Sequence, residues 1–244
     1  MGTAIVVTSG KGGTGKTSIT GGVAGSLARL GHSVLCIDMD IGLRNLDISL
    51  GLSDRALMDF SDVAEGRCPL VRAAVNHPDL PGLALLTAPM TLSPALTEEA
   101  VRRMLDTARS LYDYVLIDSP AGLGAGFRMA CCGADRAIVV STNDASFLRD
   151  AQRTVGELDF LRQIHLVMNR IQPKLLRQLR TTIDDAMDTA GLPLLGVVPE
   201  DPQVMLSANL GRPLILGGRQ GAANACLNIA KRLEGRRVPI MRIR

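Results

Sequence analysis

The stretch Gly10–Ser18, with the sequence GKGGTGKTS, holds the residues of this chain that are best suited to bind phosphate. It fits the spacing G-x-x-x-x-G-K-[ST], because Gly10 is followed by Gly15, Lys16 and Thr17. Glycines let backbone N–H groups turn inward onto phosphate oxygens, and a helix that begins here adds partial positive charge. We expect Lys16 to reach the β- and γ-phosphates of a nucleotide and the Thr17 hydroxyl to ligate Mg²⁺.

The segments on either side of this loop decide between two interpretations, a phosphate site and a glycine turn without a ligand. The apolar run Ala4–Val7 precedes the loop, and a small-residue helical pattern follows it from about Ser18 to Arg29. This order of strand, glycine loop and helix favours phosphate binding. The candidate phosphate ligands are Gly10, Lys11, Gly12, Gly13, Thr14, Gly15, Lys16, Thr17 and Ser18.

Carboxylates follow two other apolar runs. Asp38 ends the run Ser33–Asp38, and Asp118 ends the run Tyr112–Asp118. Functional residues of a parallel sheet gather where its strands end, so these side chains are placed to meet the phosphate loop. We expect Asp118 to hold Mg²⁺ directly or through water, although an aspartate at a strand end is also common for structural reasons alone.

The remaining pattern alternates strands with helices. The repeated order of strand and helix predicts an α/β fold with a doubly wound, mainly parallel sheet flanked by helices. Further helices are expected at 97–110 and 222–233. Further strands are expected at 83–88, 134–142, 165–170 and 194–199.

Composition limits the class of protein. With 244 residues, 46% hydrophobic and 21% charged, we expect a single domain over residues 1–235 and a short basic and apolar tail over 236–244. No run approaches the ~20 apolar residues of a membrane span, and the chain starts with a strand pattern, so a cytoplasmic location is expected. A net charge of +3 does not demand a nucleic-acid partner.

A second lysine, Lys11, follows the first glycine and gives the sequence KGGTGKT. This loop resembles that of the deviant Walker A ATPases, the MinD/ParA family of P-loop ATPases. In that family the extra lysine crosses a dimer interface to the phosphates of the partner's nucleotide. The resemblance therefore implies an ATP-dependent homodimer in which Lys11, like Lys16, takes part in catalysis; a solvated surface charge is the alternative.

Two more segments are very similar to the MinD branch of this family: DMDIGLRNLD at 38–47, its switch I, and DSPAG at 118–122, its switch II. The resemblance implies that Asp40 orients or activates the attacking water and that Asp38 belongs to the magnesium shell. A carboxylate can accept a hydrogen bond from water, which fits this role. Asn45 is expected to face the partner subunit, and surface aspartates without function are the alternative.

The base of the nucleotide has its own candidate residues. Asn169 ends the predicted strand at 165–170, and by resemblance its amide would hydrogen-bond adenine, since an amide both donates and accepts. The turn formed by Pro199, Glu200 and Asp201 resembles the segment that cradles adenine in the MinD branch. His165 is expected to be an ordinary strand residue.

The resemblance implies a function as well as a site. It implies a Mg²⁺-dependent ATPase, slow and stimulated by partners, that dimerises with ATP and positions the bacterial division septum. The implied partners are a MinC-like division inhibitor and a MinE-like or other topology factor. Peripheral contact with the inner face of the cell membrane is also implied. MinD proteins usually end in an amphipathic helix, but Pro239 in RRVPIMRIR opposes one here, so only weak attraction to anionic lipid is expected.

Other functions remain open at this point. A ParA-type partition ATPase would use basic residues such as those at 170–180 on DNA phosphates, and a flagellar-number regulator would act through protein partners. A metabolic kinase or ligase is a further alternative, but the sequence shows no motif for a second substrate.

The adjacent Cys131 and Cys132 invite comparison with the iron–sulfur ligands of the nitrogenase iron protein. No cysteine lies between Cys68 and Cys131 to act as the other ligand, so free thiols are expected.

Overall fold

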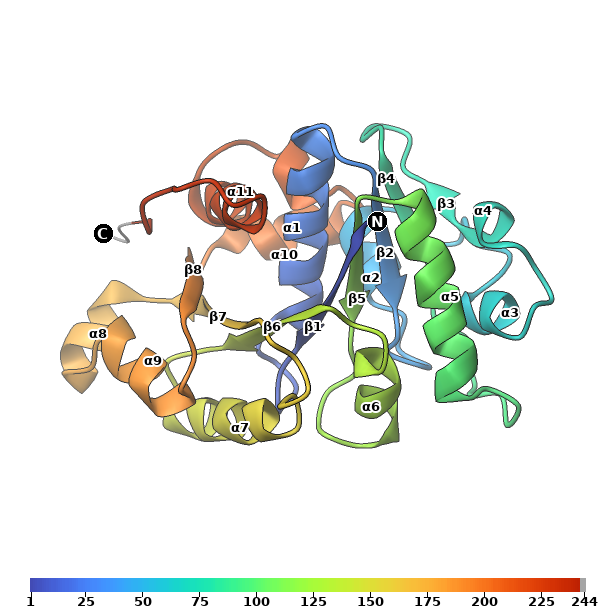
Figure 1. The fold of residues 1–244 in the computed structure, drawn as a ribbon. Coiled ribbons are helices and arrows are strands. Elements are labelled where there is room, and N and C mark those ends of the chain that lie inside the picture. The colour runs from blue at the N-terminus through green and yellow to red at the C-terminus, as the bar shows by residue number, and fades with distance from the viewer. Residues whose placement is uncertain (242–244) are drawn as a thin grey trace.

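Eight strands form one sheet in the computed structural model, which describes residues 1–241 (Figure 1). Along the chain the strands are β1 (Thr3–Thr8), β2 (Val34–Asp38), β3 (Val75–Asn76), β4 (Leu83–Leu86), β5 (Tyr114–Asp118), β6 (Arg136–Ser141), β7 (Ile164–Ile171) and β8 (Leu194–Pro199). Their spatial order is β3-β4-β2-β5-β1-β6-β7-β8. Every neighbouring pair is parallel except β3 with β4, so the predicted doubly wound, mainly parallel sheet is confirmed.

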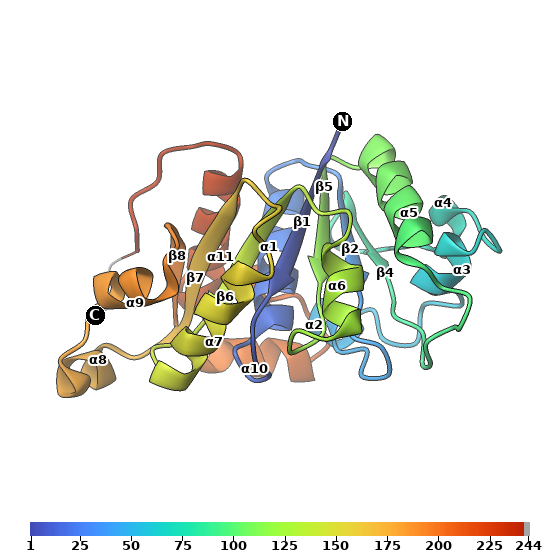
Figure 2. The ribbon, with the colours of Figure 1, turned by 60° about the horizontal axis from the view of Figure 1, so that its bottom comes forward.

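Helices cover both faces of the sheet, as two views of the ribbon show (Figures 1 and 2). They are α1 (Lys16–Arg29), α2 (Leu46–Leu50), α3 (Phe60–Ala64), α4 (Leu70–Ala73), α5 (Glu98–Leu111), α6 (Ala125–Cys131), α7 (Ala145–Gly156), α8 (Pro173–Leu179), α9 (Ile183–Ala190), α10 (Pro202–Asn209), the 3-10 turn η1 (Leu214–Leu216) and α11 (Gly221–Leu233). One apolar cluster joins the sheet to α3–α7 and α9. The other joins it to α1, α2, η1 and α11.

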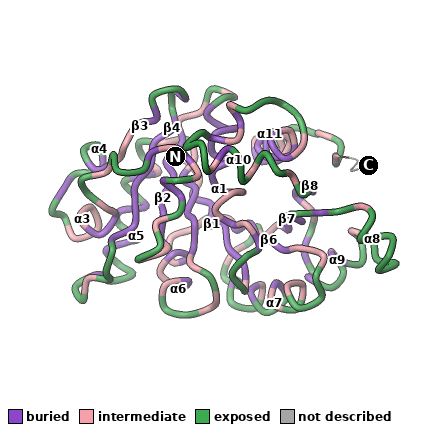
Figure 3. The backbone as a smooth tube through the Cα atoms, turned by 180° about the vertical axis from the view of Figure 1, so that it is seen from behind, coloured by how far each residue is buried: buried purple, intermediate pink, exposed green. Residues whose placement is uncertain are grey.

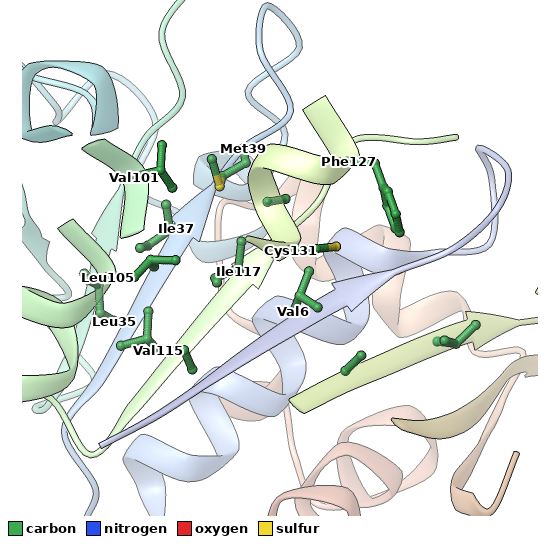
Figure 4. Packing of buried hydrophobic residues seen from close by; sticks show 14 of the residues in the cluster. Val6, Leu35, Ile37, Met39, Val101, Leu105, Val115, Ile117, Phe127 and Cys131 are labelled. Carbon is green, nitrogen blue, oxygen red and sulfur yellow. The ribbon is translucent and has the colours of Figure 1, made fainter. Parts of the chain in front are cut away.

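The central strands are mostly apolar between their ends because both of their faces are buried (Figure 3). In β5, Val115 and Ile117 point to the cluster beneath α5, where Val101 and Leu105 pack with them (Figure 4). Leu116 between them belongs to the opposite cluster, under α1. This alternation follows from the two-residue period of a strand and places helices on both sides.

Some element boundaries differ from the sequence-based prediction. Helix α1 begins at Lys16, two residues before the predicted start, because Gly15 adopts a left-handed φ of 87° and the helix follows it directly. Lys16 and Thr17 therefore lie in its first turn. Strand β4 ends at Leu86 and β5 begins at Tyr114, so both strands are shorter than predicted.

The structure describes the C-terminal tail as far as residue 241. Residues 236–241 contain no helix, and the part of the predicted tail at 242–244 lies outside the described residues. Within residues 1–241 no helix combines the length and apolar character that crossing a membrane would require. The division into a domain at 1–235 and a tail stays a prediction.

Candidate nucleotide-binding site

Strand register brings the chemically active segments together. Asp38 of β2 lies beside Asp118 of β5, and Asp118 lies beside Val7 of β1 on its other side. The phosphate loop follows β1 directly, so the loop and both strand-terminal carboxylates meet at one edge of the sheet. The sequence prediction that these residues converge is confirmed by this pairing.

The phosphate loop has the backbone form that an anion site needs. Gly13 and Gly15 have left-handed φ angles of 91° and 87°, which orient the loop toward the start of α1. No side chain caps α1 at Gly15, so the first N–H groups of the helix are left for a ligand. The Thr14 hydroxyl is buried and has no hydrogen-bond partner among residues 1–241.

Asn169 holds the loop from the side of β7. Its Nδ2 donates to the Thr14 carbonyl at 2.8 Å. A Cβ added at Gly15 would lie 2.4 Å from the same Nδ2, so this contact requires glycine. One N–H of the Asn169 amide is thus engaged within the protein, which leaves the second N–H and the oxygen for the base that the resemblance implies for this residue.

Thr17 and Asp118 form the center of the candidate metal site. The Thr17 hydroxyl donates to Asp118 Oδ2 at 2.6 Å, and the Thr20 hydroxyl donates to Oδ1 at 3.1 Å. Burial raises the pKa of Asp118 to about 7, opposed by the hydrogen bond from Thr17 and reinforced by the charge of Asp38. A cation at this point would favour the ionised carboxylate and offset the cost of its burial.

Asp38 organises the loop that follows β2. It accepts hydrogen bonds from the backbone N–H groups of Asp40 at 2.9 Å and Leu46 at 3.1 Å. Burial raises its pKa to about 6, and these two bonds oppose the rise. Asp38 therefore fixes the path of residues 40–46, and with it the place of Asp40.

The charges of two of the carboxylates, Asp118 and Asp40, act on Lys16. Burial lowers its pKa, while the negative charges of Asp118 and Asp40 raise it. Burial raises the pKa of Asp40, and the charge of Lys16 lowers it. These opposing effects show that the three groups share one electrostatic site, with Asp40 the least buried of them.

A cavity of about 440 Å³ continues from the loop to α10 and α11. Pro199, Glu200 and Asp201 line it, as does Asn169, so the predicted base residues are brought together. Asp201 accepts from the Gln203 and Ala222 backbone N–H groups, each at 2.9 Å, and Glu200 pairs with Arg170 at 2.8 Å. Both acidic side chains are therefore engaged within the protein.

Sequence reasoning missed the apolar wall of this cavity. Its residues lie in helix or turn segments whose apolar pattern looks the same whether they pack inside the protein or face a ligand. The missed residues include Ile19, Val204, Met205, Leu214 and Cys226.

Lys11 lies outside this cluster, at the surface. Its Nζ is 5.3 Å from the centroid of the Phe147 ring on α7, and its backbone carbonyl accepts from the Ser9 hydroxyl at 2.7 Å. Asn45 is also exposed, at the start of α2. Among the described residues neither side chain contacts the candidate metal site, and the roles that the resemblance implies for Lys11 and Asn45 stay predictions.

These residues fit a nucleotide and Mg²⁺. The loop presents helix N–H groups and a buried lysine, and the cavity beside it has room for a base. Residues 1–241 contain no group of three or more His, Cys, Asp or Glu side chains that could hold a metal ion. Magnesium bound with a nucleotide does not need one, because phosphates and water supply most of its ligands. None of the five cysteines forms a disulfide among residues 1–241.

Known proteins share this arrangement. Residues 5–214 match the family described as the CobQ/CobB/MinD/ParA nucleotide binding domain. The septum site-determining protein MinD of Synechocystis sp. is 40% identical over 97% of this chain and 91% of its own. MinD of Bacillus subtilis is also 40% identical, over 98% of this chain and 92% of its own. The chain belongs to the MinD family.

Solved structures agree with this assignment. A MinC:MinD cell division protein complex from Aquifex aeolicus has a chain that superposes with a TM-score of 0.92 at 36% identity, covering 98% of both chains. MinD of Pyrococcus horikoshii, solved with Mg-ADP, gives a TM-score of 0.84 at 27% identity over 96% of each chain. A ParA family ATPase from Chlorobium tepidum shares only the fold, at 21% identity. Members of the MinD/ParA family are ATPases, and this MinD-family chain holds the phosphate loop and carboxylates of one.

Proposed function

We propose that this chain is an ATP-dependent switch that dimerises with ATP, hydrolyses it to ADP and positions the division septum. The observation that supports this most is the contact of Thr17 with Asp118 beneath a loop that holds Lys16. A glycine turn without a ligand would not need a buried lysine and a buried carboxylate beside it. The MinD proteins that match this chain along nearly its whole length support the division role.

The roles of the residues follow from their positions. Lys16 and the N–H groups of Gly13–Thr17 would bind the β- and γ-phosphates, and Thr17, Asp38 and Asp118 would hold Mg²⁺ directly or through water. Bound magnesium would offset negative charge on the transferring phosphoryl group. Asp38 fixes the loop that carries Asp40, and Asp40 accepts a hydrogen bond from the attacking water. The cavity beside Pro199 receives the base.

The homodimer completes the site in this proposal. Lys11 is exposed next to α7 and is free to reach the nucleotide of a facing subunit. A cation from the partner would stabilise charge that develops during hydrolysis. ATP binding and dimerisation are thereby coupled, and hydrolysis releases the dimer.

The MinD relatives of this chain also support proposals for its partners and its location. The Aquifex aeolicus neighbour is a MinC:MinD complex, which supports a MinC-like inhibitor as a partner of this chain. A MinE-like or other topology factor would stimulate the slow hydrolysis. We also propose that residues 1–235 act as one ATPase domain, and that the protein is cytoplasmic with peripheral contact at the inner face of the membrane.

Sedimentation of an Asp40→Ala variant tests the switch. The variant keeps the phosphate loop and loses the group that positions water, so it should bind ATP and remain dimeric. It is compared in Mg·ATP and Mg·ADP, with and without vesicles that contain anionic lipid. A dimer with ATP alone that also pellets with the vesicles supports the whole proposal. Normal hydrolysis by this variant would remove Asp40 from its role, and a monomer in ATP would contradict the switch.

A further inference from the structure

A second depression lies at the edge of the sheet opposite the nucleotide site. It measures about 470 Å³ and is lined by the amino ends of β6, β7 and β8 and by the end of α11. Figure 2 shows these three strands side by side. Since the strands are parallel and six to eight residues long, roughly 20 Å separate their two ends.

Three arginines from separate segments meet in this depression. Arg136 begins β6, Arg162 precedes β7, and Arg232 belongs to the last turn of α11. His165, the second residue of β7, lies among them. Burial and the charge of Arg136 lower the pKa of His165, so its ring is neutral near pH 7.

Among residues 1–241, none of the three arginines forms an ion pair. Asp135, next to Arg136 in the chain, pairs with Arg109 instead. Glu234 is the one acidic residue of the lining, and it pairs with His32 and Arg236.

Arg232 is held in place by neutral groups alone. It donates to the backbone carbonyls of Leu195 at 2.9 Å, Val238 at 3.0 Å and Pro239 at 2.6 Å. These bonds orient the guanidinium without cancelling its charge, and burial lowers its pKa. A guanidinium has five N–H donors, so some remain for a ligand.

Three arginines that line one depression, with no ion-pair partner among residues 1–241, would attract an anion. Guanidinium groups match the oxygen geometry of phosphate and bind it through two parallel hydrogen bonds. We propose that the depression is a binding site for a phosphate-bearing ligand, held by Arg136, Arg162 and Arg232. Two sources have this chemistry: a free phosphate ester and the headgroup of an anionic phospholipid. The site is separate from the nucleotide site.

The ring of His165 can report the binding of phosphate to the depression. It has three histidines, and only His165 lies in the depression. The ring signals are followed by NMR at low salt, with Mg·ADP in excess to fill the phosphate loop. Inorganic phosphate or glycerol 3-phosphate should shift the His165 signals until saturation. The buried His77, which contacts Leu50, should stay unchanged.

A double variant, Arg136→Gln with Arg162→Gln, supplies the control. Loss of two charge-assisted contacts should weaken phosphate binding by roughly tenfold or more, while ADP affinity stays the same because the nucleotide site is at the other edge. No shift of His165 with either phosphate compound, together with equal vesicle binding by both proteins, would overturn the proposal. So would equal phosphate affinity in the wild type and the double variant, again together with equal vesicle binding.

Binding to lipid vesicles then distinguishes a phospholipid headgroup from a free phosphate ester as the ligand. Wild type and double variant are sedimented with phosphatidylglycerol–phosphatidylcholine vesicles and with phosphatidylcholine vesicles alone. If the double variant loses binding to the first kind only, the ligand is the lipid headgroup. If vesicle binding is equal but glycerol 3-phosphate binding is lost, the ligand is a soluble phosphate ester. Each of these outcomes supports the phosphate site. A change in ATP-dependent dimerisation would concern the proposed switch and not this depression.

Discussion

The Thr17 hydroxyl donates a hydrogen bond of 2.6 Å to Asp118 Oδ2, which joins the first turn of α1 to the end of β5. The two residues are far apart in sequence, and the contact brings a hydroxyl and a carboxylate to the point where phosphates are expected. Hydroxyl and carboxylate oxygens are ligands that suit Mg²⁺. We therefore propose that the metal site lies at this contact, within the larger nucleotide site.

Replacing Thr17 tests that location. Thr17→Val keeps the shape of the side chain and removes the hydroxyl, so ADP affinity should lose its dependence on Mg²⁺. Calorimetry with Mg²⁺ and with a chelator should show the magnesium effect fall by roughly tenfold or more. Thr20→Val is the control, because it removes the other hydroxyl on Asp118 without removing a candidate ligand. Equal losses in both variants would assign the effect to Asp118 alone.

Replacing each of the two lysines of the loop should have a different effect. Lys16 is buried at the site, and Lys16→Ala should abolish nucleotide binding because the main cation on the phosphates is lost. Lys11 is exposed, and Lys11→Ala should bind ATP with little change but stay monomeric. Light scattering with Mg·ATP and calorimetry measure the two effects. Tight ATP binding by Lys16→Ala, or a dimer of Lys11→Ala, would refute the corresponding assignment.

Alanine substitutions at two glycines of the loop can be compared directly, because the two glycines have similar backbone angles. Gly13 and Gly15 both have left-handed φ angles, so alanine at either costs about 1–2 kcal/mol in backbone strain. A Cβ at Gly15 also meets Asn169 Nδ2 at 2.4 Å, whereas a Cβ at Gly13 meets nothing within 4 Å. Gly15→Ala should therefore lower the free energy of unfolding by about 1 kcal/mol more than Gly13→Ala. Urea denaturation without nucleotide compares them, and equal losses would mean that Asn169 moves aside freely.

The stability of the nucleotide-free protein should depend on pH through Asp118. Its pKa is about 7 in the folded protein and 3.8 ordinarily. Between these values the folded state holds a proton that the unfolded state has released. The contribution of Asp118 therefore favours folding at low pH and is lost as pH rises through this window. Asp38, with a pKa of about 6, adds to the lower part of the same trend.

Denaturation midpoints measured across this window check the prediction. Asp118→Asn should flatten the fall in stability, because the titrating group is gone. Asp113→Asn should leave the slope unchanged, since hydrogen bonds from Ser33 hold the pKa of Asp113 below its usual value and outside the window. An unchanged slope in Asp118→Asn would show that other groups control the pH dependence.

The phosphate site could be predicted from sequence because its parts are local. The residues Gly10–Thr17 form a continuous loop, and the run of apolar residues that ends at Asp118 predicts a buried strand with the carboxylate at its end. Parallel strands place such ends on one edge, so the convergence of Asp38 and Asp118 also followed from the pattern. Repeated strand and helix patterns were sufficient for the fold class.

Other features were decided only by tertiary structure. Strand β3 is two residues long, too short for a pattern, and forms only because β4 lies beside it. The apolar wall of the base cavity depends on how α10 and α11 pack over the loop. Arg136, Arg162 and Arg232 meet because strand register aligns β6 with β7 and α11 ends beside them. Residue spacing determines local backbone form and the ends of strands, whereas contacts between distant segments depend on pairing and packing over the whole chain.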